Sequence, residues 1–377
     1  MRGHFWLLTM GSLGITRLTK DSGKGEPMQE TPETKMAMIE NAGRRRMLRT
    51  LTAGALATSG GLLSVRAFAG GLATVNMQLG WVPGGNQVGE VVAKRLGYYE
   101  KEGIDFHIQP GGPNIDGVAI VASGRFQAGE ISSSPSIMLA VSEGLPIKCI
   151  AVGLQQHPYT FFSLKKAPIR SPQDMIGKRI GIQSTGMVLL RALLAKHKIP
   201  ESQVKIVPVG ADMMPLVAGQ VDAVTGWQTN TTALKPLGAD RVDLRLWDTG
   251  VRLYALPYYA TTSSLKEHPE VVAGFLRATA RGWMYANQNR DQAVDMLVKD
   301  YPNLNRADER VAIDSLMSYA FNQTTQTQGW GAMDAGVWEE QIAMYGQLGQ
   351  FRAHQPKVED VMTMDVLKAT HSSRLTV

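Results

Sequence analysis

The chain has 377 residues, of which 44% are hydrophobic and 19% are charged, a composition typical of a globular protein. It excludes an intrinsically disordered chain, a collagen-like repeat and a protein that crosses a membrane many times. The length indicates two domains. A single cysteine, Cys149, excludes an intramolecular disulfide and any zinc or iron–sulfur site built from cysteines.

The formal net charge of +6 is concentrated near the N-terminus. Ten of the 39 basic residues and five of the 33 acidic residues fall within positions 1–69, which leaves 29 basic and 28 acidic residues in positions 70–377. A nucleic-acid-binding protein needs a basic face on its folded part. We therefore expect no nucleic-acid partner.

Residues 1–69 have the layout of an export leader. The paired arginines Arg44 and Arg45 precede an apolar stretch at 51–65, and Ala-Phe-Ala at 67–69 offers a small-x-small cleavage site. The arginine pair resembles a twin-arginine signal. We expect cleavage after Ala69, localisation in the periplasm and no lipid anchor, because no cysteine follows the apolar stretch. The alternative is a buried N-terminal helix with a basic cap.

Strand-like and helix-like segments then alternate in two series. The first series predicts strands at 74–79, 104–108, 126–131 and 147–152, and helices at 87–97, 114–123 and 135–144. The second predicts strands at 179–183, 204–209 and 223–226, and helices at 171–174, 184–197, 213–218 and 229–237. Positions 266–350 are mainly helical, with breaks near Pro302 and Gly329. This alternation predicts an α/β fold of two lobes, each a parallel or mixed sheet covered by helices.

Four of the predicted strands are followed by polar, small or aromatic residues and then by a helix. Ligands of open α/β sheets bind outside the carboxyl ends of the strands, where helix N-termini present free N–H groups. Trp81 and Trp227 follow strands of different lobes, so their rings can sandwich a planar ligand. The candidate binding residues in these loops are Trp81, Asn86, Gln87, Ser133, Ser134, Ser184, Thr185, Trp227, Thr229 and Asn230.

The two crossovers between the series supply three more candidates, Gln155, Tyr159 and Tyr258. Each class of candidate has a structural alternative. Serine and threonine cap helices, tryptophan packs in cores, and the tyrosines can pack at a hinge. His157 is more readily explained as a structural histidine than as a ligand contact.

No catalytic constellation is present in the sequence. The nucleophile elbow, the phosphate-binding loop, the dinucleotide fingerprint and the zinc-protease motif are all absent. The six histidines after position 69 have no metal-ligand spacing. We therefore predict no catalytic residue, no cofactor and no metal, and expect that the protein is not an enzyme.

A series of short stretches carries a family resemblance. In order along the chain, the stretches at 80–83, 93–104, 142–147, 174–181 and 218–223 resemble those of periplasmic solute-binding proteins of ABC importers. The branch is the one that takes up nitrate, sulfonates, taurine and thiamine-related pyrimidines. The resemblance covers about residues 74–370.

This resemblance implies a two-lobe Venus-flytrap fold, the type II periplasmic-binding-protein fold, with crossover strands near 155–163 and 254–263. The first lobe would comprise 74–156 with 260–370, and the second 157–259. It also implies a monomer that closes on a small solute by hinge motion and delivers it to a membrane permease and its ATPase.

The residues indicate the identity of the ligand less directly than they indicate the fold. The four loops contain no Arg or Lys, which favours a planar, mostly neutral solute such as a thiamine-related pyrimidine over a small dianion. The pyrimidine binders of the family often carry an acid where this chain has Gly80. A sulfonate stays open, because backbone N–H groups alone can hold an anion. Two further roles also stay open. One is a sensor that presents its solute to a membrane receptor, and the other is an enzyme like the thiamine-pyrimidine synthases, whose Cys-rich motif this chain lacks.

Overall fold

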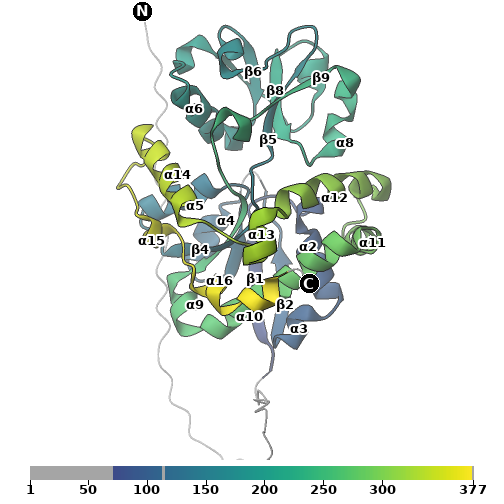
Figure 1. The fold of residues 1–377 in the computed structure, drawn as a ribbon, viewed down its shortest axis with the longest axis vertical. Coiled ribbons are helices and arrows are strands. Elements are labelled where there is room, and N and C mark those ends of the chain that lie inside the picture. The colour runs from purple at the N-terminus through teal and green to yellow at the C-terminus, as the bar shows by residue number, and fades with distance from the viewer. Residues whose placement is uncertain (1–70, 113–114, 376–377) are drawn as a thin grey trace, which may run out of the picture. The chain divides into compact units, whose positions relative to one another are not determined.

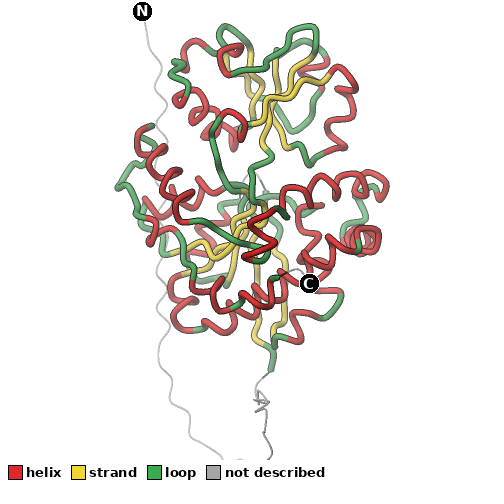
Figure 2. Tube along the Cα trace, viewed as in Figure 1, coloured by secondary structure: helices red, strands yellow, loops and turns green. Residues whose placement is uncertain are grey.

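The computed structural model describes residues 71–112 and 115–375 (Figure 1). The predicted leader at 1–69 lies outside the described residues. Two five-stranded sheets, each with helices around it, make up the part that is described, as the strand and helix colouring of Figure 2 shows. The α/β class with two mixed sheets is confirmed.

The first sheet has the strand order β2-β1-β3-β10-β4. Its strands β1, β2 and β3 are parallel, whereas β10 runs antiparallel to β3 and β4. Because Leu79 and Glu130, the last residues of β1 and β3, are paired, the loops after both strands leave at the same edge. The strands are β1 (Ala73–Leu79), β2 (Ile104–Gln109), β3 (Ala128–Glu130), β4 (Ile147–Leu154) and β10 (Ala255–Thr261).

The second sheet has the same pattern, with the order β7-β6-β8-β5-β9. Here β6 is parallel to β7 and β8, and β5 is antiparallel to β8 and β9. Tyr159 at the start of β5 pairs with Trp227 at the end of β8, so both lie at one edge. The strands are β5 (Tyr159–Leu164), β6 (Arg179–Ile182), β7 (Lys205–Pro208), β8 (Ala223–Trp227) and β9 (Arg241–Arg245).

Two chain crossovers connect the sheets, between β4 and β5 and between β9 and β10. They lie side by side, because the backbone N–H of His157 donates to the carbonyl of Leu253 at 3.0 Å. Residues 255–259, which the family resemblance placed in the second lobe, pair in β10 with the first sheet. The buried rings of Tyr258 and Tyr259 explain this placement, since they contribute to the core of that sheet.

Helices from both ends of the described chain cover the first sheet. Helix α10 packs along α2, and the later helices return to the same sheet (Figure 1). They are α2 (Val88–Arg95), α3 (Tyr98–Lys101), α4 (Gly117–Ala122), α5 (Ser134–Ser142), α9 (Thr262–Glu267), α10 (Pro269–Gln288), α11 (Arg290–Asp300), α12 (Arg306–Ala320), α13 (Gln323–Gln328), α14 (Ala335–Gln347), α15 (Val358–Val361), α16 (Asp365–Ala369) and α17 (His371–Arg374).

The second sheet has shorter helices. They are α6 (Met187–Lys196), α7 (Met214–Val217) and α8 (Thr231–Leu234), with 3-10 turns η2 (Pro172–Met175), η3 (Ser184–Gly186), η4 (Glu201–Gln203), η5 (Lys235–Asp240) and η6 (Trp247–Thr249). One further turn, η1 (Gly85–Gln87), precedes α2 in the first lobe. The predicted helix at 229–237 is thus divided between α8 and η5. Strand β9 was not predicted.

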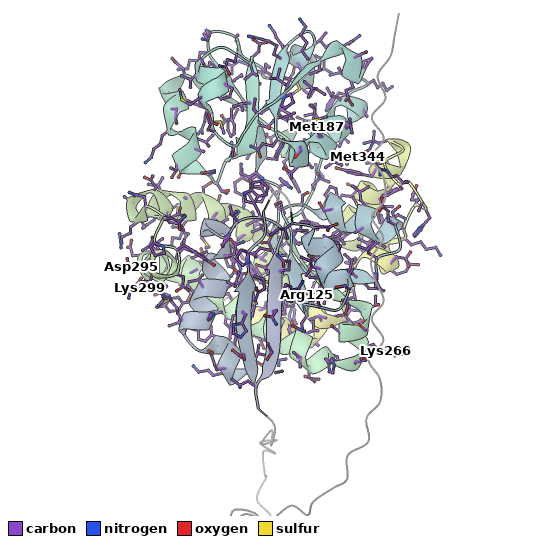
Figure 3. All side chains as sticks on the ribbon, turned by 180° about the vertical axis from the view of Figure 1, so that it is seen from behind. Arg125, Met187, Lys266, Asp295, Lys299 and Met344 are labelled. Atoms are coloured by element: carbon purple, nitrogen blue, oxygen red, sulfur yellow. The ribbon has the colours of Figure 1, made fainter. Side chains whose placement is uncertain are left out.

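The C-terminal helices also touch the second sheet's helices. Tyr345 of α14 donates a hydrogen bond to the Val188 carbonyl in α6 at 3.4 Å. Figure 3 labels Met187 and Met344 next to this contact. None of the helices in 71–112 and 115–375 has both the length and the apolar character of a membrane span.

Candidate functional site

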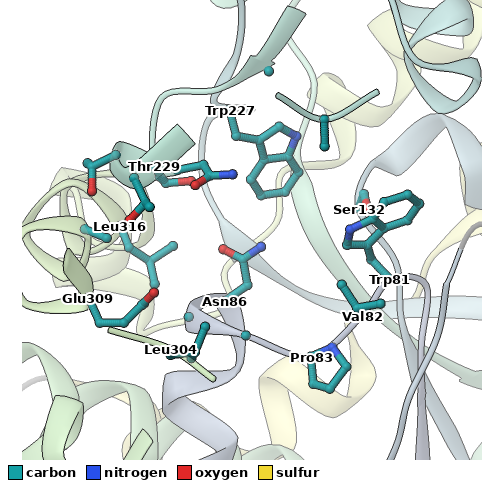
Figure 4. Close-up of a pocket in the computed structure, with 18 of the residues that line it drawn as sticks. Trp81, Val82, Pro83, Asn86, Ser132, Trp227, Thr229, Leu304, Glu309 and Leu316 are labelled. Atoms are coloured by element: carbon teal, nitrogen blue, oxygen red, sulfur yellow. The ribbon is translucent and has the colours of Figure 1, made fainter. Parts of the chain in front are cut away.

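A cavity of about 400 Å³ lies between the two sheets (Figure 4). Its lining comes from the loops after β1 and β3, the loops after β6 and β8, and helices α11 and α12. This volume suits a small organic ligand.

The loop after β1 forms one wall. Trp81 is 37% exposed and Val82 is 54% exposed, so two large apolar side chains are open to solvent at the cavity. Gly80 is required just before them, because a Cβ there would lie 2.8 Å from Cγ1 of Ile131. The acid that many pyrimidine binders of the family carry at this position therefore cannot be placed here without moving Ile131.

Asn86 and Gln87 lie at the end of the same loop and have different surroundings. Asn86 lines the cavity. Gln87 is buried behind it, where its Oε1 accepts from the N–H of Gly84 at 2.9 Å and its Nε2 donates to Oε2 of Glu130 at 3.0 Å. Gln87 thus fixes the conformation of the loop by connecting it to β3.

The second sheet supplies the facing wall. Trp227 ends β8, and the polar residues Thr229, Asn230, Thr231 and Thr232 follow it along the cavity. The Asn230 side chain also caps α8, since its Oδ1 accepts from the N–H of Ala233 at 3.3 Å.

His157 lines the cavity between these walls and is buried. Its Nδ1 accepts from the backbone N–H of Tyr159 at 3.2 Å, which leaves the proton of the neutral ring on Nε2. Burial lowers the pKa of His157 to about 3, and the nearby backbone of Ser132 offsets this only in part. The ring is therefore neutral at physiological pH.

Three polar side-chain atoms of the cavity lining are buried and form no hydrogen bond of ordinary geometry within the described residues. They are Nε2 of His157, the hydroxyl of Tyr159 and Oγ1 of Thr231. A buried polar group without a partner costs free energy. All three atoms are covered by the protein itself, so a ligand can reach them only if the lining moves.

The predicted site residues therefore divide into two groups. The structure brings Trp81, Asn86, Ser133, Tyr159, Thr185, Trp227, Thr229 and Asn230 to one cavity. It places Gln87, Ser134, Gln155, Ser184 and Tyr258 outside the lining.

Side-chain hydrogen bonds explain most of the second group. Ser134 is buried against Oε1 of Gln341 at 2.6 Å, and Nε2 of Gln155 donates to the Ala332 carbonyl at 2.9 Å. The Tyr258 hydroxyl donates to the buried carboxyl of Glu90. Ser184 is exposed at the start of η3.

Sequence reasoning missed the wall formed by α11, α12 and the turn between them. Its members are Val294, Leu297, Asn303, Leu304, Glu309, Ala312, Ile313 and Leu316. They do not follow strands, so the rule that points to strand ends does not find them. Neither Lys nor Arg lines the cavity, and no group of three His, Cys, Asp or Glu within the described residues is arranged to hold a metal.

A family model described as NMT1/THI5 like matches residues 85–293. The chain belongs to this family. The formylaminopyrimidine-binding protein of Halalkalibacterium halodurans is 28% identical over 280 residues, which cover 72% of this chain and 84% of the relative. The periplasmic aliphatic sulphonate binding protein SsuA of Escherichia coli has the same fold, with a TM-score of 0.61 at 15% identity over 78% of this chain and 99% of SsuA. The NMT1/THI5-like family thus confirms the resemblance and, with SsuA, the two-lobe fold.

The prediction that the protein is not an enzyme is contradicted by relatives that are named as enzymes. A 4-amino-5-hydroxymethyl-2-methylpyrimidine phosphate synthase of Legionella pneumophila is 28% identical over 237 residues, which cover 61% of this chain and 74% of the relative. Synthases of the same name from Schizosaccharomyces pombe and Uromyces fabae are 27% and 26% identical. The missing sequence motifs did not reveal this, because they belong to unrelated folds and one fold can host several functions.

Proposed function

We propose that the protein is an exported solute-binding protein that holds a planar heterocycle in the cavity between its sheets. The observation that carries this proposal is the pair Trp81 and Trp227, which lie on different walls of one cavity whose lining has no Lys or Arg (Figure 4). Aromatic faces hold planar ligands through stacking and apolar burial. The relatives named for a pyrimidine support the same class of ligand.

The proposal also includes the localisation of the protein and its protein partner. The predicted leader supports export to the periplasm by the twin-arginine route. Structural neighbours named as periplasmic binding proteins support delivery of the solute to an ABC permease and its ATPase. The eight predicted residues that line the cavity are proposed as ligand contacts.

Thermal unfolding with a ligand panel tests the proposal. The panel holds aminopyrimidines, thiamine, riboflavin, purines, taurine, alkanesulfonates and nitrate. A ligand at 100 times its Kd stabilises a protein by about 2.7 kcal/mol, which raises Tm by several degrees. We expect a shift with one heterocycle that is lost in both Trp81→Ala and Trp227→Ala. A shift with sulfonates alone would contradict the heterocycle, and so would a shift that both variants retain.

The synthases among the relatives favour a second candidate, formation of a pyrimidine phosphate. Mass spectrometry separates the two candidates. A binding protein returns its bound heterocycle unchanged after denaturation. A synthase instead releases a pyrimidine phosphate.

A further inference from the structure

The loop of residues 80–87, called here the Trp81 loop, is anchored at both ends to one residue, Glu130 at the end of β3. At its start, the backbone N–H of Gly80 donates to the Glu130 carbonyl at 2.8 Å. At its end, Nε2 of Gln87 donates to Oε2 of Glu130 at 3.0 Å. Oε1 of Gln87 accepts from the N–H of Gly84, in the middle of the loop, at 2.9 Å. The carboxyl of Glu130 is therefore connected to the centre of the loop through one side chain.

Glu130 does not line the cavity, but the loop that it anchors does. Trp81, Val82 and Asn86 of the Trp81 loop form part of the cavity wall (Figure 4). Gln87 and Glu130 are buried behind this wall, with exposed fractions of 5% and 4%. The position of the wall thus depends on hydrogen bonds to a carboxyl group in the core.

The surroundings of Glu130 disfavour a charge. Glu90 of α2 is a second buried acid, and its charge acts on Glu130. Tyr258 of β10 pairs with Glu130 in the sheet and donates its hydroxyl to Glu90. The other ionisable groups whose pKa values reflect one of the two acids, or that lie next to them on α4, are Tyr99, Tyr259, Tyr301 and Asp116. All of these groups are acids or phenols, and none is a cation.

Ionisation of Glu130 is therefore costly as long as the Trp81 loop stays closed. Burial raises the pKa of Glu90 to about 7 and that of Glu130 to about 8, so both acids are charged only above about pH 8. A neutral Glu130 accepts from Gln87 without placing a charge in the core. Two carboxylates there would have no cation among these neighbours, and water that reaches Glu130 relieves the cost. Movement of the loop, whose outer side lines the cavity, admits that water.

We propose that Glu130 is a positioning residue that holds the Trp81 loop closed while it is neutral and releases it when it ionises, so that the cavity wall opens as the pH rises. The inference rests on the proposed function, because it adds a pH-dependent control to the same binding cavity. An open loop returns Glu130 to water and to its ordinary pKa of 4.5, so opening becomes more favourable from about pH 4.5 to about pH 8. A solute that packs on Trp81 therefore binds less tightly at alkaline pH.

Hydrogen–deuterium exchange of the full chain without ligand tests this device. The exchange of peptides that contain 80–87 is followed between about pH 5 and pH 8, and each rate is divided by the intrinsic rate at that pH. We expect the protection of these amides to fall at least about tenfold over this range in the wild-type protein, since linkage allows up to about tenfold per pH unit. Peptides of β9 in the second sheet should show no such fall.

Four variants separate a positioning role from a merely structural one. Glu130→Gln keeps an acceptor for Gln87 without a charge, so the loop should stay protected and vary less than about threefold with pH. Glu130→Leu has no acceptor and should lower the protection at about pH 5 by at least about threefold. Glu90→Gln removes the neighbouring charge but keeps the anchor, so the fall should be smaller than in the wild-type protein.

Glu309→Gln is the matched control. Its carboxylate also lies against the loop, since a Cβ on Gly85 would be 2.5 Å from Oε2 of Glu309, but it is not part of the hydrogen bonds that join Glu130 to Gly84. Glu309→Gln should therefore keep the wild-type pH dependence. Constant protection in the wild-type protein would overturn the inference even if a variant fails to fold, and so would a fall that Glu130→Gln retains. Because no ligand is used, failure of the whole ligand panel to raise Tm would overturn the proposed function and leave the control of the loop by Glu130 standing.

Discussion

The imidazole of His157 meets the indole of Trp227 edge to face, with ring centroids 5.3 Å apart and an interplanar angle of 72°. His157 belongs to the crossover between the sheets, and Trp227 ends β8 of the second sheet. The imidazole is fixed in turn by the N–H of Tyr159, which donates to Nδ1. Trp227, one of the two indole rings proposed to hold the ligand, is therefore oriented by the chain crossover that connects the two sheets.

The first prediction concerns acid stability. The folded state keeps His157 neutral down to about pH 3, whereas the unfolded chain takes up a proton near pH 6.5. His157 therefore lowers the free energy of unfolding as the pH falls below 6.5, on the order of 3 kcal/mol by pH 4. His157→Gln should lose stability less steeply than the wild-type protein over this range in urea titrations. The exposed His354→Gln is the control, and identical slopes for all three proteins would contradict the prediction.

A second prediction concerns the two buried acids beneath the loop after β1. Burial raises the pKa of Glu90 to about 7 and that of Glu130 to about 8, and the charge of Glu90 adds to the effect on Glu130. The Tyr258 hydroxyl donates a hydrogen bond to Glu90 and accepts one from the indole N–H of Trp283. No cation pairs with either acid within the described residues.

Glu90 and Glu130 make the free energy of unfolding fall as the pH rises, whereas His157 makes it fall as the pH decreases. A carboxyl whose pKa is raised on folding stabilises the folded state below its ordinary pKa of 4.5, and this contribution is lost as the pH rises to about 8. We expect Glu130→Gln to retain more of its unfolding free energy than the wild-type protein between pH 4.5 and 8, by at least about 1 kcal/mol. The exposed Glu359→Gln should follow the wild-type curve. A steeper curve for Glu130→Gln would refute the assignment.

The order of strands and helices could be predicted because the spacing of apolar residues and the positions of glycine and proline reflect local burial. Residues 74–79 alternate as a half-buried strand, and β1 covers Ala73–Leu79. Strand β9 escaped because Arg241–Arg245 alternates charged and apolar residues over only five positions, a pattern that an exposed loop also shows. Local pattern therefore found the elements that are long or strongly apolar.

The cavity could be predicted only in part, for a physical reason. The strand-end rule led to Trp81, Thr229 and Trp227, which all line it. The rule cannot say which neighbour in a loop points inwards, so Gln87 was included although it is buried behind the cavity. Glu309 could not be found at all, because only the return of the C-terminal helices brings α12 to the loops.

Gly186 provides a third prediction, at the contact between η3 and the start of β5. A Cβ there would lie 2.9 Å from Cζ of Tyr159 and closer still to its hydroxyl. Gly186→Ala should displace the Tyr159 ring from the cavity and weaken binding of the heterocycle at least about tenfold, with a stability cost of about 1–3 kcal/mol. Titration calorimetry measures the first effect and urea unfolding the second. Gly112→Ala after β2 has open space at its Cβ and lies outside the cavity lining, so it should do neither. Unchanged affinity in Gly186→Ala would show that Tyr159 is not a contact.

The fourth prediction concerns the contact that holds α10 on α2. A Cβ on Gly282 would lie 2.9 Å from the backbone N of Ala93 and 2.8 Å from its Cβ, with the carbonyl of Gly89 closer still. Backbone atoms cannot give way as a flexible side chain can, so Gly282→Ala must separate the two helices. We expect a loss of about 1–3 kcal/mol in the free energy of unfolding, which exceeds the gain of about 1 kcal/mol that alanine brings to a helix interior.

Gly274 lies in the same helix and provides the matched control. Its added Cβ would meet Cβ of Glu102 at 3.3 Å and Cδ1 of Ile104 at 3.4 Å, distances that small side-chain movements relieve. Gly274→Ala should therefore be near neutral or slightly stabilising in urea unfolding, while Gly282→Ala unfolds at lower urea with the same slope. Equal effects of the two substitutions would mean that helix propensity, not the close approach of α2 and α10, decides stability here. In that case α2 and α10 could move apart at little cost in free energy, although Gly89 and Gly282 pack closely.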